Sequence, residues 1–261
     1  MAPRNGREHV VITGAAGAIG AALAREFRRV QPRAHLSLLD VDEPGLARVK
    51  HALAPPVSTH VVDLESHEAL ADAWPTWTAG PGPVTTLVNC AGIMIIRSLA
   101  GTSWQTARRL LDIDLVAPLR LMDLAVPDML AAGRGCVINV TSMAGVTPLR
   151  GCAYYGAAKS GLAMASEIAN LELRDRGVHV LTVYPGPVES ALERNARAGY
   201  GAGSWTRHVP NGEPQALAAL VVEAVARRAD RVIYPRAYAL AARVPTISSW
   251  IARTFSPHPV E

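Results

Sequence analysis

A tyrosine and a lysine four positions apart are the residues of this sequence that point most clearly to chemistry. In a helix, the spacing of Tyr155 and Lys159 places the phenol and the ammonium one turn apart on the same face. Lys50 is the only other lysine, and a chance Tyr-x-x-x-Lys is expected only about 0.05 times in a chain of this composition. A phenol, with an ordinary pKa of about 10, accepts protons well at neutral pH only beside positive charge. The pair is therefore a candidate for proton transfer, and Ser142 lies thirteen residues before Tyr155.

A glycine-rich segment lies near the N-terminus, between a predicted strand and a predicted helix. It runs from Thr13 to Gly20 as TGAAGAIG. Glycines in such a turn let the backbone bend tightly and approach a pyrophosphate, whose negative charge the helix N-terminus favours. The segment predicts a dinucleotide-binding turn. An ordinary glycine-rich turn is the alternative, because short glycine patterns recur by chance.

An acidic residue, Asp40, ends the next predicted strand, about twenty residues after the glycines. A carboxylate at this place accepts hydrogen bonds from both hydroxyls of the adenosine ribose and repels a 2′-phosphate. The glycine turn contains no Arg or Lys, and Val41 follows the acid. The sequence therefore predicts NAD as the cofactor in preference to NADP. Two alternatives stay open: Asp40 caps the next helix, or Asp42 shares either role.

The elements that position these residues follow from an alternation of short β-branched segments with longer helical patterns. The segments that read as strands are His9–Thr13, His35–Asp40, Val57–Val62, Val84–Asn89, Cys136–Thr141, Val178–Val183 and Arg231–Tyr234. Ala- and Leu-rich helical patterns span roughly 18–30, 103–131 and 153–176. Strands that are apolar on both faces are typical of a parallel sheet buried under helices. We therefore expect an α/β fold, a doubly wound parallel seven-stranded sheet with helices on both faces.

Several motifs occur in the same order as in a known family. They are Thr13–Gly20, Asp40, Asp63-Leu64, Asn89-Cys90-Ala91-Gly92, Ser142, Tyr155 with Lys159, and Pro185-Gly186-Pro187-Val188-Glu189-Ser190. Over nearly its whole length the sequence resembles the short-chain dehydrogenase/reductase family. The resemblance implies a single Rossmann-type domain over residues 1–261, with NAD(H) running across the carboxyl edge of the sheet.

The resemblance also implies roles at the reacting centre. Tyr155 resembles the general acid/base, Lys159 the residue that binds the ribose and activates the tyrosine, and Ser142 the group that polarises the substrate oxygen. An alcohol would lose its proton to Tyr155 as hydride moves to the nicotinamide, and in reverse Tyr155 would protonate the alkoxide formed from a carbonyl. The implied activity is that of an NAD-dependent alcohol dehydrogenase or ketone reductase.

By the same resemblance, three groups of residues are expected to contact the dinucleotide. The phosphate turn supplies Gly14, Ala16, Gly17, Ala18, Ile19 and Gly20; the adenosine side supplies Asp40, Asp63, Leu64, Asn89, Ala91 and Gly92; the nicotinamide side supplies Tyr155, Lys159, Pro185, Gly186, Val188 and Ser190. Asp63 resembles the acid that contacts the adenine amino group, and Asn89 opens a segment that lines the ribose and supports the central strands. Ordinary turns are the alternative for Asp63 and for the segment 185–190.

Two positions depart from the family pattern. Ala18 stands where the middle glycine usually falls and Gly17 precedes it, so the turn also fits the G-x-x-G-x-x-G spacing of the larger extended relatives. Asp114 stands where the family usually has an Asn that holds a water for proton relay near the lysine. An ionised Asp114 would pair with Lys159, offset part of the lysine's effect on the pKa of Tyr155, and move the activity optimum to higher pH. The alternative is that Asp114 only caps or kinks its helix.

The sequence defines the substrate less closely. The residues expected near the pocket mouth are mainly apolar: Met94, Ile95, Ile96, Ala144, Val146, Leu149 and Tyr200 or Trp205. We therefore expect a hydrophobic secondary alcohol or ketone, with Arg97 or Arg150 as the candidates for meeting a charged group. Residues 190–214 read as a long irregular segment rich in glycine, which predicts a substrate loop or a disordered segment.

The C-terminal region and two helical patterns bear on partners. An apolar helical face is predicted within residues 236–255, formed by Leu240, Val244, Ile247, Ile251 and Phe255. It would cover the substrate mouth, bind a partner chain, touch a membrane surface, or simply pack on the domain. The helical patterns at 103–131 and 153–176 resemble the family's pairing surfaces, which implies a homodimer or homotetramer.

Composition narrows the remaining function classes. Of 261 residues, 49% are hydrophobic and 18% charged, as in a globular protein with a large core, and the net charge of +4 is scattered without the basic stripe typical of nucleic-acid binding. Cys90, Cys136 and Cys152 lack the C-x-x-C spacing of metal or redox sites, so no metal is expected. With no apolar signal core and no apolar run of about 20 residues, a cytoplasmic protein without a transmembrane segment is expected. The rival interpretations are an NADP-preferring reductase and a catalytically idle dinucleotide-binding sensor or scaffold.

Overall fold

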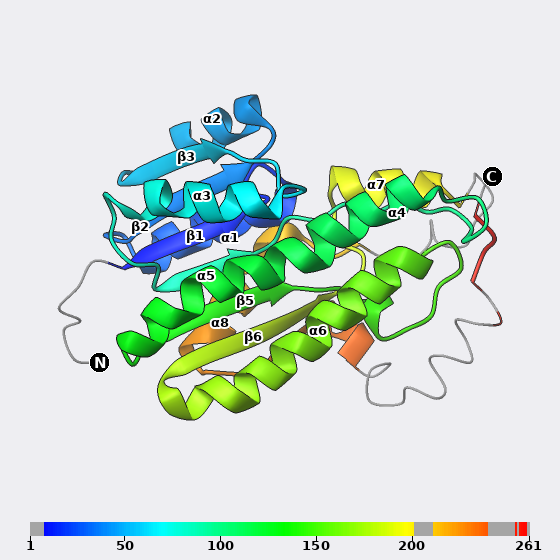
Figure 1. Ribbon diagram of the computed structural model, residues 1–261. Coiled ribbons are helices and arrows are strands. Elements are labelled where there is room, and N and C mark those ends of the chain that lie inside the picture. The colour runs from blue at the N-terminus through cyan, green and yellow to red at the C-terminus, as the bar shows by residue number, and fades with distance from the viewer. Residues whose placement is uncertain (1–7, 201–210, 240–253, 255, 260–261) are drawn as a thin grey trace.

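The computed structural model describes residues 8–200, 211–239, 254 and 256–259. Its strands form a seven-stranded, all-parallel sheet in the order β3-β2-β1-β4-β5-β6-β7, which confirms the predicted fold (Figure 1). In chain order the strands are β1 His9–Thr13, β2 His35–Asp40, β3 Val57–Val61, β4 Thr86–Asn89, β5 Gly135–Val140, β6 Val178–Pro185 and β7 Arg231–Tyr234.

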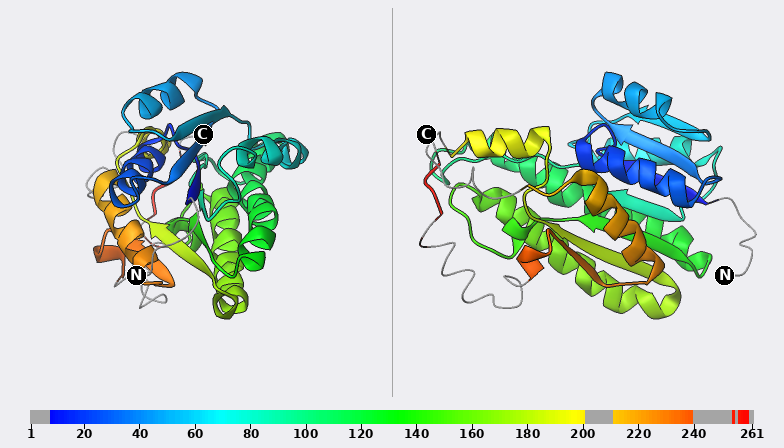
Figure 2. Two further views of the ribbon diagram at one scale, coloured as in Figure 1. Left: turned by 90° about the vertical axis from the view of Figure 1, so that its left-hand side faces the viewer. Right: turned by 180° about the vertical axis from the view of Figure 1, so that it is seen from behind.

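Helices cover both faces of this sheet, as Figure 2 shows from two further sides. One face carries α1 (Ala18–Val30), α2 (Glu43–His51) and α8 (Pro214–Ala226). The other face carries α3 (His67–Thr78), α5 (Ala117–Ala131) and α6 (Ala153–Leu173). Two shorter helices, α4 (Trp104–Leu111) and α7 (Ala191–Ala198), follow β4 and β6 along the chain.

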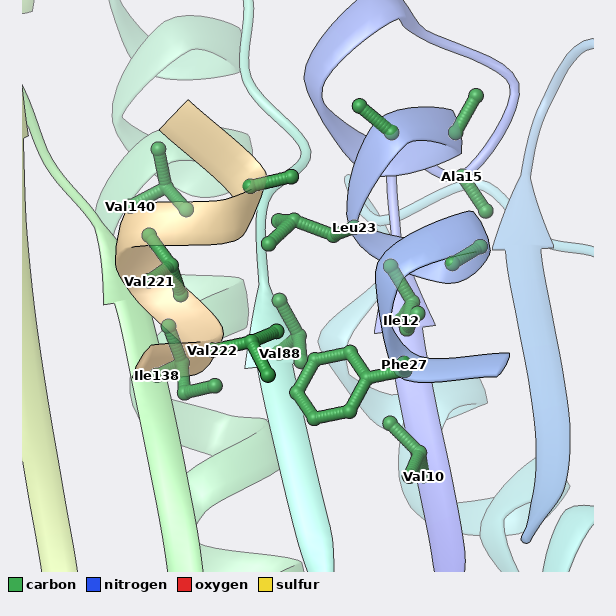
Figure 3. Close-up of a cluster of buried hydrophobic side chains, with 14 of the residues drawn as sticks. Val10, Ile12, Ala15, Leu23, Phe27, Val88, Ile138, Val140, Val221 and Val222 are labelled. Atoms are coloured by element: carbon green, nitrogen blue, oxygen red, sulfur yellow. The ribbon is translucent and has the colours of Figure 1, made fainter. Parts of the chain in front are cut away.

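Alternation along each strand divides the core into two layers. Successive side chains of a strand point to opposite faces, so Val10 and Ile12 meet α1 and α8, whereas Val11 meets the opposite helices. Figure 3 shows the first layer, in which Phe27 of α1 lies among Val10, Val88 and Val222. Phe27 is only 1% exposed, and truncating a buried phenylalanine to alanine typically costs about 3–5 kcal/mol. This packing fixes α1 on the sheet beneath the site.

The strand order locates the functional edge of the sheet. From β1 the chain builds outward through β2 and β3, then returns to place β4 on the other side of β1. Ligands of open α/β sheets bind in the crevice outside the carboxyl ends of the strands at such a reversal. The residues that follow β1, β2, β4 and β5 are therefore the ones brought together.

The helix predicted over 103–131 is not continuous. The chain forms α4, then a π-helical turn over Asp112–Val116, and then α5, with Pro118 in the first turn of α5. The sequence pattern does not reveal the interruption because apolar residues continue through the turn. The π turn buries the Asp114 carboxyl completely, and single π turns frequently occur at functional sites.

The irregular segment predicted over 190–214 contains a helix. Ser190 caps α7 by accepting a hydrogen bond from the Glu193 backbone N–H, and Val188 forms an isolated parallel bridge with Gly212. The serine and glutamate are spaced as in a capping box. This signal for a helix start was not considered when the segment was predicted to be irregular. Residues 201–210 lie outside the described residues, as does most of the apolar helix predicted over 236–255.

Several element boundaries differ from the predicted ones by one to three residues. β3 ends at Val61, β4 begins at Thr86, β5 runs from Gly135 to Val140, and β6 continues to Pro185; the helix predicted over 153–176 ends at Leu173 and is followed by a 3-10 turn over Arg174–Arg176. Strand ends depend on hydrogen bonds to the neighbouring strand, which a local pattern does not contain. No helix within the described ranges is long and apolar enough to cross a membrane.

Candidate functional site

A cavity of about 800 Å³ lies at the carboxyl edge of the sheet and gathers nearly all the residues predicted for the site. Those that line it are Gly14, Ala16, Gly17, Ala18, Ile19, Gly20, Asp40, Asp63, Leu64, Ala91, Gly92, Ser142, Tyr155, Lys159, Pro185, Gly186, Val188 and Ser190. Asn89 and Asp114 do not line it. The dinucleotide turn and the reacting residues thus share one space.

The glycine turn is packed too tightly for side chains. Gly14 has φ +66°, and a Cβ built there would lie 2.7 Å from the Ala91 Cα. A Cβ on Gly20 would lie 2.1 Å from the Gly14 carbonyl oxygen. No side chain caps the start of α1, and no acidic residue lies in its first turn. The first N–H groups of this helix, which have no acceptor within the helix, therefore face the cavity edge in a form that suits a pyrophosphate.

Asp40 is fastened to the turn by its own carboxylate. Its Oδ2 accepts a hydrogen bond from the Ala16 N–H at 2.9 Å, and its Oδ1 accepts one from the Asp42 N–H at 3.1 Å. Asp42 caps α2 by accepting a hydrogen bond from the Gly45 N–H at 3.0 Å. The alternative that Asp40 caps the helix is wrong, because Asp42 does so, and both acids line the cavity.

Asp63 and Asn89, both predicted on the adenosine side, are placed differently. Asp63 lines the cavity and also accepts a hydrogen bond from the Glu65 N–H at 3.0 Å, as in an ordinary turn. The Asn89 side chain points away into a buried polar network, where its Nδ2 donates to Asn139 Oδ1 at 2.8 Å and to the Pro118 carbonyl at 3.3 Å. Asn89 therefore ties β4 to β5 and α5, and its neighbours Ala91 and Gly92 form the wall.

Tyr155, Lys159 and Ser142 converge from α6 and from the end of β5. The Lys159 ammonium lies 5.9 Å from the centroid of the Tyr155 ring, and both side chains are almost fully buried. Ser142 caps a short 3-10 turn, Met143–Gly145, by accepting a hydrogen bond from the Ala144 N–H at 3.1 Å. The hydroxyl of Ser142 also interacts with Tyr155.

The electrostatics of this group depend on burial and on three neighbours. Burial raises the pKa of Tyr155 above its ordinary value, Lys159 and Ser142 lower it in part, and the Asp114 carboxyl raises it further. Burial alone would lower the pKa of Lys159, but Asp114 and Tyr155 more than offset this and the lysine pKa is raised. Lys159 therefore carries its positive charge at neutral pH, while Tyr155 is a protonated phenol.

Asp114 forms a buried ion pair directly behind Lys159. Its Oδ2 is 3.1 Å from Lys159 Nζ, and its Oδ1 accepts a hydrogen bond from the Ile93 N–H at 2.8 Å. Burial raises the pKa of Asp114, whereas Lys159 lowers it in part. A Cβ at Gly92 would lie 3.0 Å from the carboxylate oxygen, so the lack of a side chain at this position leaves room for the ion pair. The alternative that Asp114 only caps or kinks its helix is wrong, because its carboxyl contacts Lys159.

The segment after β6 closes the cavity next to the reacting residues. The Tyr238 ring packs on Gly186, where a Cβ would lie 2.9 Å from the ring. Val188 is buried, and Ser190, predicted to contact the nicotinamide, also caps α7. Pro185, Gly186, Val188 and Ser190 all line the cavity.

The end of the cavity formed by Met94, Leu149, Ala196 and Tyr200, called the far end below, contains both predicted and unpredicted residues. Of the predicted pocket residues, Met94, Ala144, Leu149 and Tyr200 line it; Ile95, Ile96, Val146, Arg97 and Arg150 do not, and Trp205 lies outside the described residues. Glu193, Arg197, Thr147, Tyr238, Ser256 and Pro257 also line it and were not predicted. The i, i+4 spacing of Glu193 and Arg197 is a helix signal that the irregular interpretation of 190–214 obscured.

The C-terminal residues are fastened beside this end of the cavity. The Arg150 N–H donates to Ser256 Oγ at 2.9 Å, and the Arg150 guanidinium donates to the Ser256 carbonyl. The Arg150 carbonyl in turn accepts a hydrogen bond from the Tyr200 hydroxyl at 2.8 Å. Arg150, a candidate for contacting the substrate, instead holds the end of α7 and the C-terminal segment together.

Among the described residues, every cation that lines the cavity has a carboxylate partner. These pairs are Arg109 with Glu65 (3.2 Å), Lys159 with Asp114 (3.1 Å) and Arg197 with Glu193 (2.5 Å). The rest of the far end is mainly apolar. The cavity is therefore suited to a ligand without a strong negative charge at that end.

Comparisons of the sequence and of the fold with known proteins agree on one family. A family model described as short chain dehydrogenase matches residues 8–201. SadH of Mycobacterium tuberculosis, a protein named an oxidoreductase, is 30% identical over 234 residues, which are 85% of this chain and 84% of that protein. The 2,5-dichloro-2,5-cyclohexadiene-1,4-diol dehydrogenase LinX of Sphingobium indicum is 28% identical over 198 residues, 75% of this chain and 78% of its own. The solved structure of a short-chain dehydrogenase from Sphingobium yanoikuyae in complex with NADPH is similar to this chain, with a TM-score of 0.78 and 25% sequence identity. The match covers 94% of this chain and 95% of that one.

Proposed function

Because this chain belongs to the short-chain dehydrogenase family, and is an oxidoreductase of that family, we propose that it transfers a hydride between NAD(H) and a hydrophobic secondary alcohol or ketone. One observation carries the proposal: Ser142, Tyr155 and Lys159 line the same cavity as the glycine turn. A phenol, an ammonium and a hydroxyl at this place have the chemistry to move one proton next to a bound dinucleotide.

The roles of the chain's own residues follow from their contacts. Ser142 holds the substrate oxygen, and Tyr155 exchanges a proton with it. In the direction of reduction, Tyr155 donates its proton to the forming alkoxide; in oxidation it must first become a phenolate, which the Lys159 ammonium stabilises. A bound nicotinamide supplies the hydride acceptor or donor. Lys159, held by Asp114, keeps its charge in place throughout.

NAD is proposed over NADP on the strength of Asp40. Its carboxylate lines the cavity at the end of β2, and Asp42 lies beside it. Two carboxylates here would repel a 2′-phosphate, and the nearby Arg48 is paired with Asp42 at 3.4 Å. The NADPH bound by the Sphingobium yanoikuyae structure makes an NADP-preferring reductase the rival, and the affinities for the two dinucleotides decide between them.

A neutral, hydrophobic substrate is proposed from the far end of the cavity. Met94, Ala144, Leu149 and Tyr200 provide apolar surface there, and the neighbouring cation already has a partner. The name of LinX, a relative that acts on a ring diol, is in keeping with a neutral alcohol substrate.

We also propose a homodimer or homotetramer formed through α6. Met164, Ile168 and Leu171 lie on one face of this helix at i, i+4 and i+7, and they are 62%, 45% and 72% exposed. An apolar stripe of this kind on a surface helix is typical of a contact between protein chains. Sedimentation or light scattering of the protein and of a Leu171→Arg variant tests this.

The test of the function is the absorbance of reduced nicotinamide with NAD and NADP in parallel, over a panel of hydrophobic secondary alcohols and ketones. Turnover with NAD that falls by about 10²–10⁴-fold in Tyr155→Phe is expected. Equilibrium binding of NAD to both proteins provides the control, because the substitution removes only a hydroxyl. Dinucleotide binding without turnover on the whole panel would contradict the proposal and favour a sensor or scaffold.

A further inference from the structure

The helix α7 brings one acidic and one basic side chain to an otherwise mainly apolar end of the cavity. Glu193 Oε1 lies 2.5 Å from Arg197 Nε, one helical turn away, and both side chains line the cavity. They are only 14% and 18% exposed. Arg197 also donates a hydrogen bond to Asn211 Oδ1, so the guanidinium is held from two sides.

The surroundings of this pair are those of the proposed substrate end. Ala196, between the two charged residues on α7, packs in a cluster with Met94, Leu149 and Tyr200. These same residues line the cavity. The Glu193–Arg197 pair therefore stands beside the apolar surface against which a substrate would pack.

A second pair on the surface shows what is unusual about the first. Glu223 and Arg227 on α8 have the same i, i+4 spacing and lie 3.1 Å apart, but their side chains are 55% and 67% exposed. Water and salt screen most of the attraction in an exposed pair, whereas a pair removed from water keeps much more of it. The charge of Arg197 is therefore strongly compensated by Glu193.

We propose that Glu193 determines specificity by occupying Arg197, so that the site accepts neutral alcohols and ketones and rejects substrates that carry a carboxylate. This inference rests on the proposed function, because it takes the far end of the cavity to be the substrate end. A carboxylate entering here meets a guanidinium that is already neutralised and a second carboxylate of the same sign. An anionic substrate must therefore displace Glu193 or stay beside it unpaired, and either arrangement is unfavourable in a site that is largely removed from water.

The test removes the charge of Glu193 and keeps its shape. Calorimetry in the presence of excess NAD measures the dissociation constants of hexanoate and of hexanamide, which differ in charge but little in size. For Glu193→Gln we expect hexanoate to bind roughly tenfold more tightly than it does to the wild type, with hexanamide changed much less. The matched control is Glu223→Gln, which makes the same change in the exposed pair and is expected to leave both constants unchanged.

A second variant identifies the cation. In the double variant Glu193→Gln with Arg197→Gln, the gain for hexanoate should disappear, because no guanidinium remains to bind it. Failure of Glu193→Gln to bind hexanoate more tightly than the wild type overturns the inference, whatever happens to the amide. An equal gain in Glu223→Gln overturns it as well.

The inference and the proposed function fail in different measurements. If the wild type turns over no alcohol or ketone but Glu193→Gln gains affinity for hexanoate, the oxidoreductase substrate class is wrong, and only the exclusion of carboxylates by Glu193 stands. If the wild type reduces a neutral ketone in a Tyr155-dependent way and Glu193→Gln gains no affinity for hexanoate, the function stands and the role of Glu193 is wrong.

Discussion

Replacing Asp114 by asparagine should shift the pH profile of alcohol oxidation to lower pH. The carboxylate lies behind Lys159, completely buried, and raises the pKa of Tyr155. Asparagine removes the charge while keeping a carbonyl oxygen that can accept the hydrogen bond from the Ile93 N–H. With the negative charge gone, the phenolate form of Tyr155 becomes easier to reach, so the acidic limb of the profile moves down.

The size of the shift follows from two separations that meet at Lys159 Nζ. This atom is 3.1 Å from Asp114 Oδ2 and 5.9 Å from the centroid of the Tyr155 ring. The carboxylate is therefore no more than about 9 Å from the centroid of the ring, and one charge at that distance, at an effective dielectric constant of about 20, is worth about 2 kcal/mol. That energy corresponds to a shift of about one pH unit.

The assay is the pH dependence of kcat/KM for oxidation of a secondary alcohol, measured for both proteins with the dinucleotide saturating. Asp112→Asn is the matched control, because Asp112 lies in the same π turn but pairs with His67 at 3.1 Å and with Arg108 at 3.3 Å. The control should leave the acidic limb in place. An unchanged limb in Asp114→Asn, a shift to higher pH, or the same shift in the control would refute the reasoning.

Three further predictions concern the turn, the cofactor and acid stability. Gly14→Ala should lower the free energy of unfolding by about 2–3 kcal/mol, because φ is +66° and the new Cβ would lie 2.7 Å from the Ala91 Cα. Urea melts check this, and Gly80→Ala is the control because a Cβ at Gly80 has no atom within 4 Å. Asp40→Ser should narrow the preference for NAD over NADP by about tenfold or more, measured as the ratio of dissociation constants. Burial lowers the pKa of His9 from 6.5 to about 4, so the unfolded chain binds a proton at this residue over a pH range in which the folded chain does not. The free energy of unfolding is therefore unaffected by His9 above pH 6.5, and about 2–4 kcal/mol of it is lost as the pH falls toward 4. Urea melts from pH 7 to 4 should show this loss in the wild type, and an equally steep loss in His9→Gln would argue against it.

Features that depend on neighbours along the chain could be predicted from the sequence. Short β-branched segments that are apolar on both faces predicted the seven strands, because each strand's own side chains indicate that both its faces are buried. The turn at Gly14–Gly20 and the one-turn spacing of Tyr155 and Lys159 are local in the same sense. The ordered motifs then implied a family, and the family match confirmed it.

What the sequence could not supply were contacts between residues distant along the chain. Asp114 and Lys159 are 45 positions apart by their numbers and meet only because a π turn and α6 pack together. The Asn89 side chain points away from the cavity and donates a hydrogen bond to Asn139, which the neighbouring strand places beside it.

The far end of the cavity shows the same division most clearly. Apolar residues near Met94 and Leu149 follow the predicted central strands, and Glu193 and Arg197 have helical spacing, so both features can be read from the chain alone. The direction in which this helix turns its ion pair, into the cavity, and the return of the segment at Ser256 to Arg150 appear only in the folded molecule. Local patterns record which side chains avoid water, but the partner that covers each of them is chosen when distant elements pack, since packing optimises contacts over the whole chain at once.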